Sequence, residues 1–374
     1  MAGIYLHIPF CKQACTYCNF HFTTSLRYKD AFVKALGKEA KAEKGYLNGE
    51  TVNTIYFGGG TPSLLAIEDL EYILQVLHNT FPVAGDAEIS MEANPDDVSE
   101  ENVRAWKCLG VNRLSIGIQS FFEEELQWMN RAHNAIQARD CIENSYAAGI
   151  CNLSIDLIYG SPLLTDEMWE YNVKTAIDYN IKHLSCYALT VEEKTPLHKT
   201  ISLKKNVDVD SEKQAGQFLQ LMQWLRESGY EHYEVSNFAK PGFRSRHNSS
   251  YWKGVPYLGL GPSAHSFNGN ERRWNMPNNN VYIKTVNEGS PQRGLETLTP
   301  AQQLNENVMI SLRTAEGLDL DKIEKFWGAQ EKNRIQNDLA TYINNGFVRM
   351  SSHHAQLTDE GMLRADGIAA DLFV

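Results

Sequence analysis

The sequence has no block of lysine or arginine, no long hydrophobic run and few cysteines. Its 374 residues include 35 Lys and Arg against 46 Asp and Glu, which gives a net charge of −11 at pH 7. The shortage of positive charge argues against nucleic acid or an anionic membrane as the main partner. The first apolar run ends at Pro9 and is too short for a signal sequence or a membrane span. We therefore expect a soluble, cytoplasmic protein that binds no nucleic acid.

The seven cysteines are too few for a disulfide scaffold in a chain of this length. Four are scattered through apolar or helical stretches: Cys108, Cys141, Cys151 and Cys186. A buried free cysteine behaves as a small hydrophobic residue, so we interpret these four as structural. The other three lie within eight residues of one another and form the first candidate site.

Apolar, strand-like segments alternate with helical patterns through the first half of the chain. The strands lie near residues 5, 55, 90, 115, 155 and 186, and the helices cover about 27–48, 67–79, 99–109, 134–148 and 166–179. Buried strands with little polar alternation, separated by helices, indicate a parallel sheet. Six βα units are too few for a closed eight-fold barrel. We therefore predict an α/β fold, a partial (β/α)6 TIM-like barrel.

The second half of the chain has a different pattern. A long helix at about 208–228 precedes a stretch at about 236–296 that is rich in Gly, Asn, Pro and aromatics and reads as irregular. Helical runs then cover 300–313, 318–327 and 331–345, followed by two short strands and a helix from 358. We predict two domains, residues 1–296 with the barrel and its extension, and residues 297–374 as a small α+β, winged-helix-like module. The module has no basic recognition helix, so DNA binding is not expected.

Cys11, Cys15 and Cys18 follow the first predicted strand with the spacing Cys-x3-Cys-x2-Cys. Closely spaced thiolates bind iron–sulfur clusters or zinc. Structural zinc usually needs a second pair of ligands, and none lies nearby, although His21 could complete a set. A four-iron cluster normally takes four cysteines, so three would leave one iron open to another molecule. We therefore favour a 4Fe–4S cluster over structural zinc.

A glycine-rich segment, GGGTP, follows the second predicted strand and includes Gly59, Gly60 and Thr61. In barrels of this kind the reactive site lies at the C-terminal ends of the strands. Glycines let the backbone approach a ligand closely, and free backbone groups can hold an ammonium or a carboxylate. A simple tight turn is the alternative interpretation.

Polar side chains also mark the next three strands. Glu92 ends the third, Gln119 ends the fourth, and Asp156 lies in the fifth. A carboxylate inside an apolar strand is costly unless it is paired or bound to a ligand. Each of the three could be satisfied by backbone groups or by Arg113 or Arg131. Their place on one edge favours the ligand interpretation, with Glu92 for an ammonium, Asp156 or Gln119 for hydroxyls, and Arg131 for a carboxylate.

The cysteine spacing resembles that of the radical S-adenosylmethionine (SAM) superfamily. There the amino and carboxylate groups of SAM chelate the open iron, and an electron from the cluster cleaves SAM to a deoxyadenosyl radical. Seven segments closely resemble the oxygen-independent coproporphyrinogen III oxidase group over about residues 3–270: YLHIPFCKQACTYCNF, YFGGGTPSLL, MEANPDD, RLSIGIQSF, WMNRAHN, IDLIYGSP and YLGLGPSAHSF. The tail fits the C-terminal domain of that group.

The resemblance implies a cofactor site with a 4Fe–4S cluster on the three motif cysteines. It places Tyr17 near the SAM adenine and the SAM amino group at the glycine motif. The SAM contacts that it implies are Tyr5, Tyr17, Gly59, Gly60, Thr61, Glu92, Gln119, Arg131 and Asp156, and, where the local match is looser, Ala188 and His265.

Position 20 separates two branches of this group. The decarboxylase has a fourth cysteine there, whereas this chain has Phe20, as the haem-chaperone branch does. That branch also has a His-Asn-x-x-Tyr-Trp motif, which HNSSYW at 247–252 matches. The implied haem-binding residues are His247, Asn248, Tyr251 and Trp252. A histidine can ligate haem iron and aromatic faces suit a porphyrin. The alternative is a turn in which His247 and Asn248 cap backbone groups while the aromatics fill the core.

The resemblance thus implies a chaperone that binds haem and delivers it to apo-haem proteins, with membrane respiratory enzymes as expected acceptors. It also implies a homodimer that depends on the cluster. We expect a cytoplasmic protein that meets the membrane only through its acceptors and has no net catalytic turnover. The intact set of SAM residues keeps an alternative open, a radical SAM oxidoreductase that decarboxylates coproporphyrinogen III.

Overall fold

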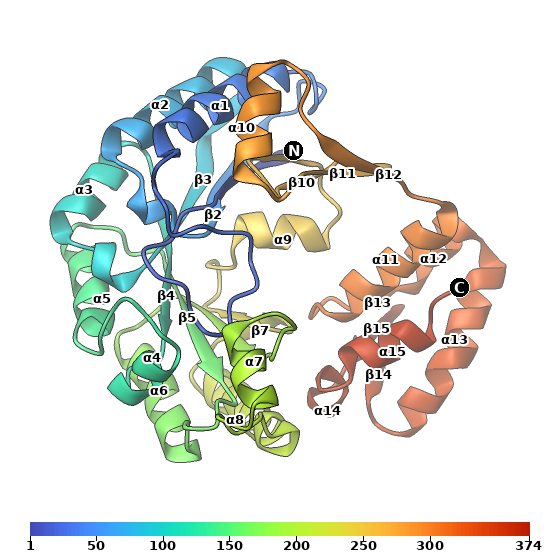
Figure 1. The fold of residues 1–374 in the computed structure, drawn as a ribbon. Coiled ribbons are helices and arrows are strands. Elements are labelled where there is room, and N and C mark those ends of the chain that lie inside the picture. Colours follow the sequence, from blue (N-terminus) through green and yellow to red (C-terminus); the bar gives the residue numbers. More distant parts are fainter. The chain divides into compact units, whose positions relative to one another are not determined.

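The computed structural model describes residues 1–374 and divides into two compact units (Figure 1). Unit 1 comprises Met1–Asp210 and Ser245–Glu296, and unit 2 comprises Ser211–Arg244 and Thr297–Val374. In the second half of the chain, unit 1 ends at Glu296 and unit 2 resumes at Thr297. The segment Ser211–Arg244 differs, because it groups with the C-terminal residues and not with the barrel.

Backbone hydrogen bonds explain why this segment belongs to unit 2. The N–H of Val235 donates to the carbonyl of Arg313 at 3.0 Å, and the N–H of Ala315 donates to the carbonyl of Tyr233 at 3.0 Å. Such pairing satisfies backbone groups that would otherwise be buried without partners. The contact joins residues about 80 positions apart in sequence, which no local pattern reveals.

Unit 1 is built on a parallel sheet. Its first six strands are β1 (Ala2–Ile8), β2 (Val52–Gly59), β3 (Val83–Ala93), β4 (Arg113–Gln119), β5 (Leu153–Tyr159) and β6 (His183–Ala188). Each pairs in parallel with the next along the chain. Strand β1 does not pair with β6, so the barrel stays open. The predicted strands and the partial α/β barrel are confirmed.

Helices cover the outer face of this sheet (Figure 1). On this face lie α1 (Lys29–Ala42), α2 (Ile67–Thr80), α3 (Glu100–Cys108), α5 (Gln137–Ala147) and α6 (Asp166–Asp178), while the short α4 (Glu123–Trp128) and α7 (Pro196–Ser202) lie in the segments that follow β4 and β6. In α2 the buried side chains Leu70, Ile73, Leu74 and Leu77 recur every three or four residues. That spacing forms one apolar stripe along the helix, which packs on the strands.

The stretch that reads as irregular from the sequence is instead largely regular, so that prediction is wrong. It contains β8 (Asn237–Ala239), α9 (Arg246–Trp252), β9 (Tyr257–Leu260), β10 (His265–Phe267), β11 (Glu271–Asn275), α10 (Asn279–Asn287) and most of β12 (Arg293–Thr297). Strand β9 pairs in parallel with β1, and β10 and β11 follow in antiparallel. Strands of three to five residues are too short to give a clear alternation.

Buried Glu39 on α1 joins this extension to the barrel. Its carboxylate accepts hydrogen bonds from the N–H of Gly261 at 2.9 Å and the hydroxyl of Tyr282 at 2.7 Å. Asn275 donates to it at 2.8 Å and Arg293 at 2.9 Å. A buried carboxylate is stable only with such complete pairing. Figure 1 shows the result, with α10 lying beside α1.

Unit 2 contains helices and two small β structures. Its elements are α8 (Ser211–Glu227), β7 (Glu231–Glu234), β8, α11 (Pro300–Leu312), β13 (Leu318–Asp319), α12 (Leu320–Trp327), α13 (Ala329–Asn344), β14 (Val348–Ser351), β15 (His354–Leu357), α14 (Asp359–Met362) and α15 (Ala365–Asp371). A capping box of Thr299 and Gln302 begins α11. The three helices and the following antiparallel hairpin β14–β15 agree with the winged-helix-like pattern.

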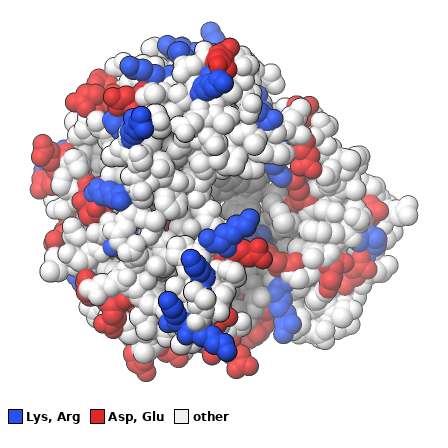
Figure 2. All heavy atoms as spheres, in the orientation of Figure 1, with Lys and Arg blue, Asp and Glu red and all other residues white.

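Two surface properties are relevant to partners. Positive and negative side chains are mixed on the face that Figure 2 draws. No helix has the length and apolar composition that a membrane crossing requires.

Replacing Glu39 by Ala should destabilise unit 1 by about 3–5 kcal/mol, because the buried N–H of Gly261 and hydroxyl of Tyr282 would lose their acceptor while Arg293 would keep only Glu43. Urea unfolding would measure this loss. Glu71→Ala on the exposed side of α2 is the matched control, with an expected change within about 0.5 kcal/mol. An equal loss of stability in the two variants would contradict the role of Glu39 in joining the extension to the barrel.

Candidate functional site

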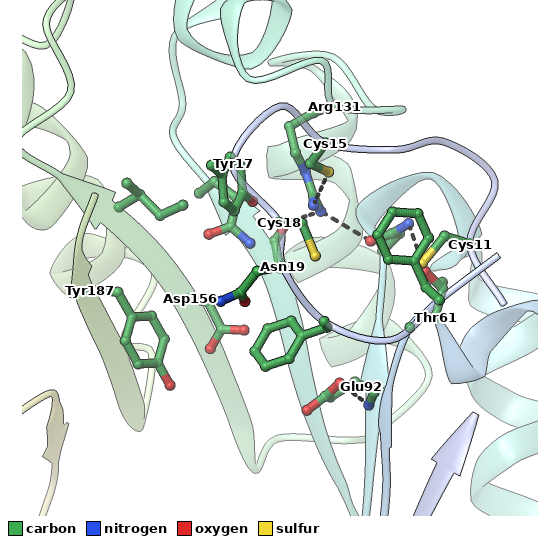
Figure 3. Close-up of a pocket in the computed structure, with 18 of the residues that line it drawn as sticks. Cys11, Cys15, Tyr17, Cys18, Asn19, Thr61, Glu92, Arg131, Asp156 and Tyr187 are labelled. Atoms are coloured by element: carbon green, nitrogen blue, oxygen red, sulfur yellow. Dashed lines mark hydrogen bonds between the residues drawn. The ribbon is translucent and has the colours of Figure 1, made fainter. Parts of the chain in front are cut away.

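The C-terminal ends of the parallel strands surround a cavity of about 420 Å³ in unit 1, within the range of about 300–1,000 Å³ for small-molecule sites. Its lining includes the three motif cysteines and most residues that the resemblance assigns to SAM (Figure 3). The SAM-assigned residues in the lining are Tyr17, Gly59, Gly60, Thr61, Glu92, Gln119, Arg131, Asp156 and Ala188. Segments far apart in the sequence therefore meet in one place.

The cysteine loop is fixed by the turn that follows β2. The N–H of Gly60 donates to the carbonyl of Ile8 at 2.8 Å, and the N–H of Thr61 donates to that of Phe10 at 2.7 Å. A Cβ on Gly60 would lie 2.7 Å from the Phe10 oxygen, closer than real contacts allow. Glycine is thus required here because the loop backbone lies against the turn.

These bonds narrow the ways in which the glycine motif could bind a ligand. The N–H of Gly59 donates to Glu92 at 3.1 Å, and those of Gly60 and Thr61 hold the cysteine loop. None of the three N–H groups is therefore left to bind a ligand. The motif supports the loop, and its expected contact with the SAM amino group, which needs acceptors such as carbonyl oxygens, stays a prediction.

The three thiols are half-buried and face the same cavity (Figure 3). Burial raises the pKa of Cys11 to about 11. The neighbouring Cys18 and Cys15 also raise this pKa, whereas the hydrogen bond with Thr61 lowers it. A bound metal would favour the thiolates. His21, the possible fourth ligand of the zinc alternative, is instead hydrogen-bonded through Nε2 to Oδ1 of Asn279 at 2.7 Å.

Glu92 on β3 and Asp156 on β5 are two half-buried carboxyl groups whose strands are separated by β4. Burial and the charge of Asp156 raise the pKa of Glu92 to about 7, although hydrogen bonds from Tyr56 and Gly59 lower it. Burial likewise raises the pKa of Asp156 to about 6, against hydrogen bonds from Ser185 and Ser115. Neither group has a cation beside it that fully compensates for burial. A ligand with an ammonium group would supply one.

Arg131 spans the other side of the cavity. Its guanidinium donates to the Cys15 sulfur at 3.2 Å, to Asn94 at 3.0 Å and to the carbonyl of Gly117 at 2.8 Å. Its Nε is buried without a partner. A carboxylate acceptor would satisfy such a donor.

Gln119 has a left-handed backbone with φ of 66° at the end of β4. Left-handed backbone in a residue other than glycine is strained and is common at binding sites. The space beside it depends on Gly117, where a Cβ would lie 2.9 Å from the Gln119 amide.

The lining also includes residues that the sequence analysis missed: Asn19, Asn94, Ser115, Gly117 and Tyr187. Asn94 and Tyr187 lie at strand ends, so the strand-end rule could have found them.

Two residues assigned to SAM lie outside the cavity lining. Tyr5 lies on β1 behind the site, with its hydroxyl 3.3 Å from Nδ1 of His7. His265 lies on β10, where its ring stacks on Trp274 at 5.9 Å. Neither contacts the cavity in this structure, so a SAM contact for these two remains a prediction.

The HNSSYW residues also lie outside the cavity lining. Helix α9 begins at Ser245, whose hydroxyl accepts from the N–H of Asn248 at 3.2 Å. The His247 ring is only 1% exposed, and both nitrogens have partners: Nδ1 with Thr54 at 2.8 Å and Nε2 with Tyr251 at 2.8 Å. In this conformation neither nitrogen can reach haem iron. The packing alternative describes the arrangement better, except that Ser245 provides the cap.

The open parallel barrel with three loop cysteines is the arrangement of a radical SAM protein, and residues 5–176 match the Radical SAM superfamily model. Residues 298–364 match the HemN C-terminal domain. The chain is 33% identical to the haem chaperone HemW of Mycobacterium tuberculosis, covering 99% of this chain and 94% of the relative. It is 31% identical to HemW of Bacillus subtilis, covering 97% of each. The chain belongs to the HemW family.

Among solved structures the chain is similar to the coproporphyrinogen III oxidase HemN of Escherichia coli. The TM-score is 0.85 at 24% identity, covering 100% of this chain and 90% of the other. This likeness establishes the fold. The cofactors of the superfamily are a 4Fe–4S cluster and SAM, and the three thiols, the uncompensated carboxyl groups and the unpartnered Arg131 donor fit both.

Replacing Cys15 by Ala should reduce bound iron and sulfide to background after anaerobic reconstitution, because a cluster held by two thiolates is lost. Iron and sulfide analysis measures this. Cys108→Ala is the control, since that cysteine is exposed and lies outside the site. An unchanged iron content in Cys15→Ala would refute the ligand assignment.

The affinity for SAM should depend on pH through Glu92. Its pKa of about 7 in the free protein means that binding an ammonium must first remove a proton below that pH. We expect SAM to bind about tenfold more weakly at pH 6 than at pH 8, measured by calorimetry on reconstituted protein. Glu92→Gln should bind weakly at both pH values.

The stability of the ligand-free protein should change with pH in the opposite direction to its SAM affinity. A carboxyl with a raised pKa stabilises the fold at low pH, and this contribution is lost as pH rises through about 7. A SAM affinity that is the same at pH 6 and pH 8 would contradict the pairing of Glu92 with the ammonium.

Proposed function

We propose that this protein is a haem chaperone that binds haem and delivers it to apo-haem proteins, using a 4Fe–4S cluster and SAM. The observation that supports this most strongly is the similarity to HemW proteins along nearly the whole chain. Phe20 stands where the decarboxylase branch would need a fourth cysteine. The cavity supplies a place for both cofactors.

In this proposal each side chain of the cavity has a defined task. Cys11, Cys15 and Cys18 hold the cluster, which when bound and reduced can supply one electron to SAM. Glu92 receives a hydrogen bond from the SAM amino group, and the Arg131 donor meets the SAM carboxylate. The half-buried Tyr17 lines the cavity and offers a flat face to the adenine. Asp156 and Gln119 are placed to accept from ribose hydroxyls.

Phe20 is the chain's clearest candidate for a first haem contact. Its side chain is 68% exposed although it lines the cavity. Tyr187, 43% exposed, lines the same cavity from the end of β6. Exposed aromatic faces suit a planar apolar macrocycle. Ligation by His247 stays part of the proposal only as a later step, because Tyr251 must first release Nε2.

The proposal places the protein in the cytoplasm and makes apo-haem proteins its partners, with membrane respiratory enzymes as expected acceptors. A cluster-dependent homodimer belongs to the same proposal. The alternative function is oxidative decarboxylation of coproporphyrinogen III. The complete set of SAM residues at the cavity favours this alternative, and Phe20 argues against it.

The decisive experiment is anaerobic reconstitution followed by haemin titration and transfer to an apo-haem protein. A chaperone should take up haem stoichiometrically with the cluster intact and load the acceptor. The same preparation should be incubated with coproporphyrinogen III, SAM and a reductant. Release of decarboxylated product would refute the carrier without turnover, and absence of haem uptake would refute the chaperone.

Replacing Phe20 by Ala should weaken haemin binding about tenfold, since removing one aromatic contact costs roughly 1.5 kcal/mol. Cluster content should not change, because Phe20 is not a ligand. Phe326→Ala in unit 2 is the matched control, as that side chain is 63% exposed and outside the cavity. Equal haemin affinity of Phe20→Ala and wild type would remove Phe20 from the haem site.

A further inference from the structure

The HNSSYW motif lies directly behind the residue assigned to the SAM ammonium. The His247 ring stacks on Tyr56 with ring centres 5.0 Å apart and an angle of 22°. The hydroxyl of Tyr56 donates to Glu92 at 2.9 Å. One aromatic side chain therefore separates His247 from a carboxylate that lines the cavity.

The position of the His247 ring is fixed from several sides. Its two nitrogens bond Thr54 on β2 and Tyr251 on α9, each at 2.8 Å. The backbone N–H of His247 donates to Glu88 at 3.1 Å, on the same strand as Glu92. On β1, Gly3 leaves the necessary space, because a Cβ there would lie 3.3 Å from the ring.

We propose that His247 is a positioning residue for the SAM site, because its fixed ring holds Tyr56 in the orientation that donates to Glu92. The inference rests on the proposed binding of SAM at Glu92. It gives the motif a task that needs no exposure to solvent. Because coupling between sites is reciprocal, any ligand that takes Nε2 from Tyr251, haem iron included, would weaken SAM binding.

Glu92 is faced by titratable groups from four elements. They are Tyr5 on β1, Tyr56 on β2, Asp156 on β5 and Tyr251 on α9. Among them Tyr56 donates a hydrogen bond to the carboxylate and so favours its charged form. Loss of that bond should raise the pH at which SAM binding reaches half its maximum.

The test compares SAM affinity against pH in reconstituted full-length variants without haem. Tyr56→Phe should weaken SAM binding at pH 7 about fivefold and move the midpoint upward, as expected for one lost hydrogen bond to a charged group. His247→Ala should do the same. Because both act through one contact, the double variant should be no worse than either single variant.

Two further variants keep the test sharp. Tyr251→Phe removes only one hydroxyl from His247 and should cause a smaller shift in the same direction, of about twofold. His232→Ala is the matched control, since that half-buried histidine stacks on Phe238 in unit 2 and should leave the midpoint unchanged.

The outcomes separate the inference from the proposed function. A shift in Tyr56→Phe with none in His247→Ala or Tyr251→Phe would overturn the positioning role alone, as would fully additive effects in the double variant. Wild type with no SAM binding, or with no pH dependence, would overturn the assignment of Glu92 and the inference with it.

Discussion

Two backbone hydrogen bonds between the β2 turn and the start of the cysteine loop set the position from which the rest of the site is built. The loop that follows β1 has no regular structure of its own, so the N–H groups of Gly60 and Thr61 fix its path through the carbonyls of Ile8 and Phe10. The close approach requires glycine at position 60. With the loop held there, the three thiols face the edge where the other strands end, and the remaining polar residues lie around them.

A second constraint is electrostatic. Partial burial raises the pKa of both Glu92 and Asp156, and the charge of Asp156 raises that of Glu92 further. Arg131 has a buried Nε without a partner on the same cavity. Polar groups left unsatisfied in a folded protein are expected at functional sites, where a ligand completes them. The amino and carboxylate groups of SAM match these two needs in sign and in kind.

The two features that separate the chaperone branch from the decarboxylase lie in very different environments. Phe20 is exposed and lines the cavity, whereas His247 is sealed beneath Tyr56. Phe20 is therefore suited to contact a large flat ligand that enters from solvent, and His247 is suited to position a residue of the cofactor site. In this arrangement, one layer of packed aromatic rings connects the haem-related motif to the carboxylate that is assigned to SAM.

The sequence alone determined the parallel strands, the amphipathic helices and the cysteine motif, because periodicity and spacing are local properties. Because reactive sites of such barrels lie at the C-terminal ends of the strands, the sequence also identified Glu92, Gln119 and Asp156 as candidates. Only the tertiary structure decided that Ser211–Arg244 joins unit 2, that Gly60 supports the loop, and that His247 is buried against Tyr56. Each of these depends on contacts between distant segments, which the order of residues along one segment does not record.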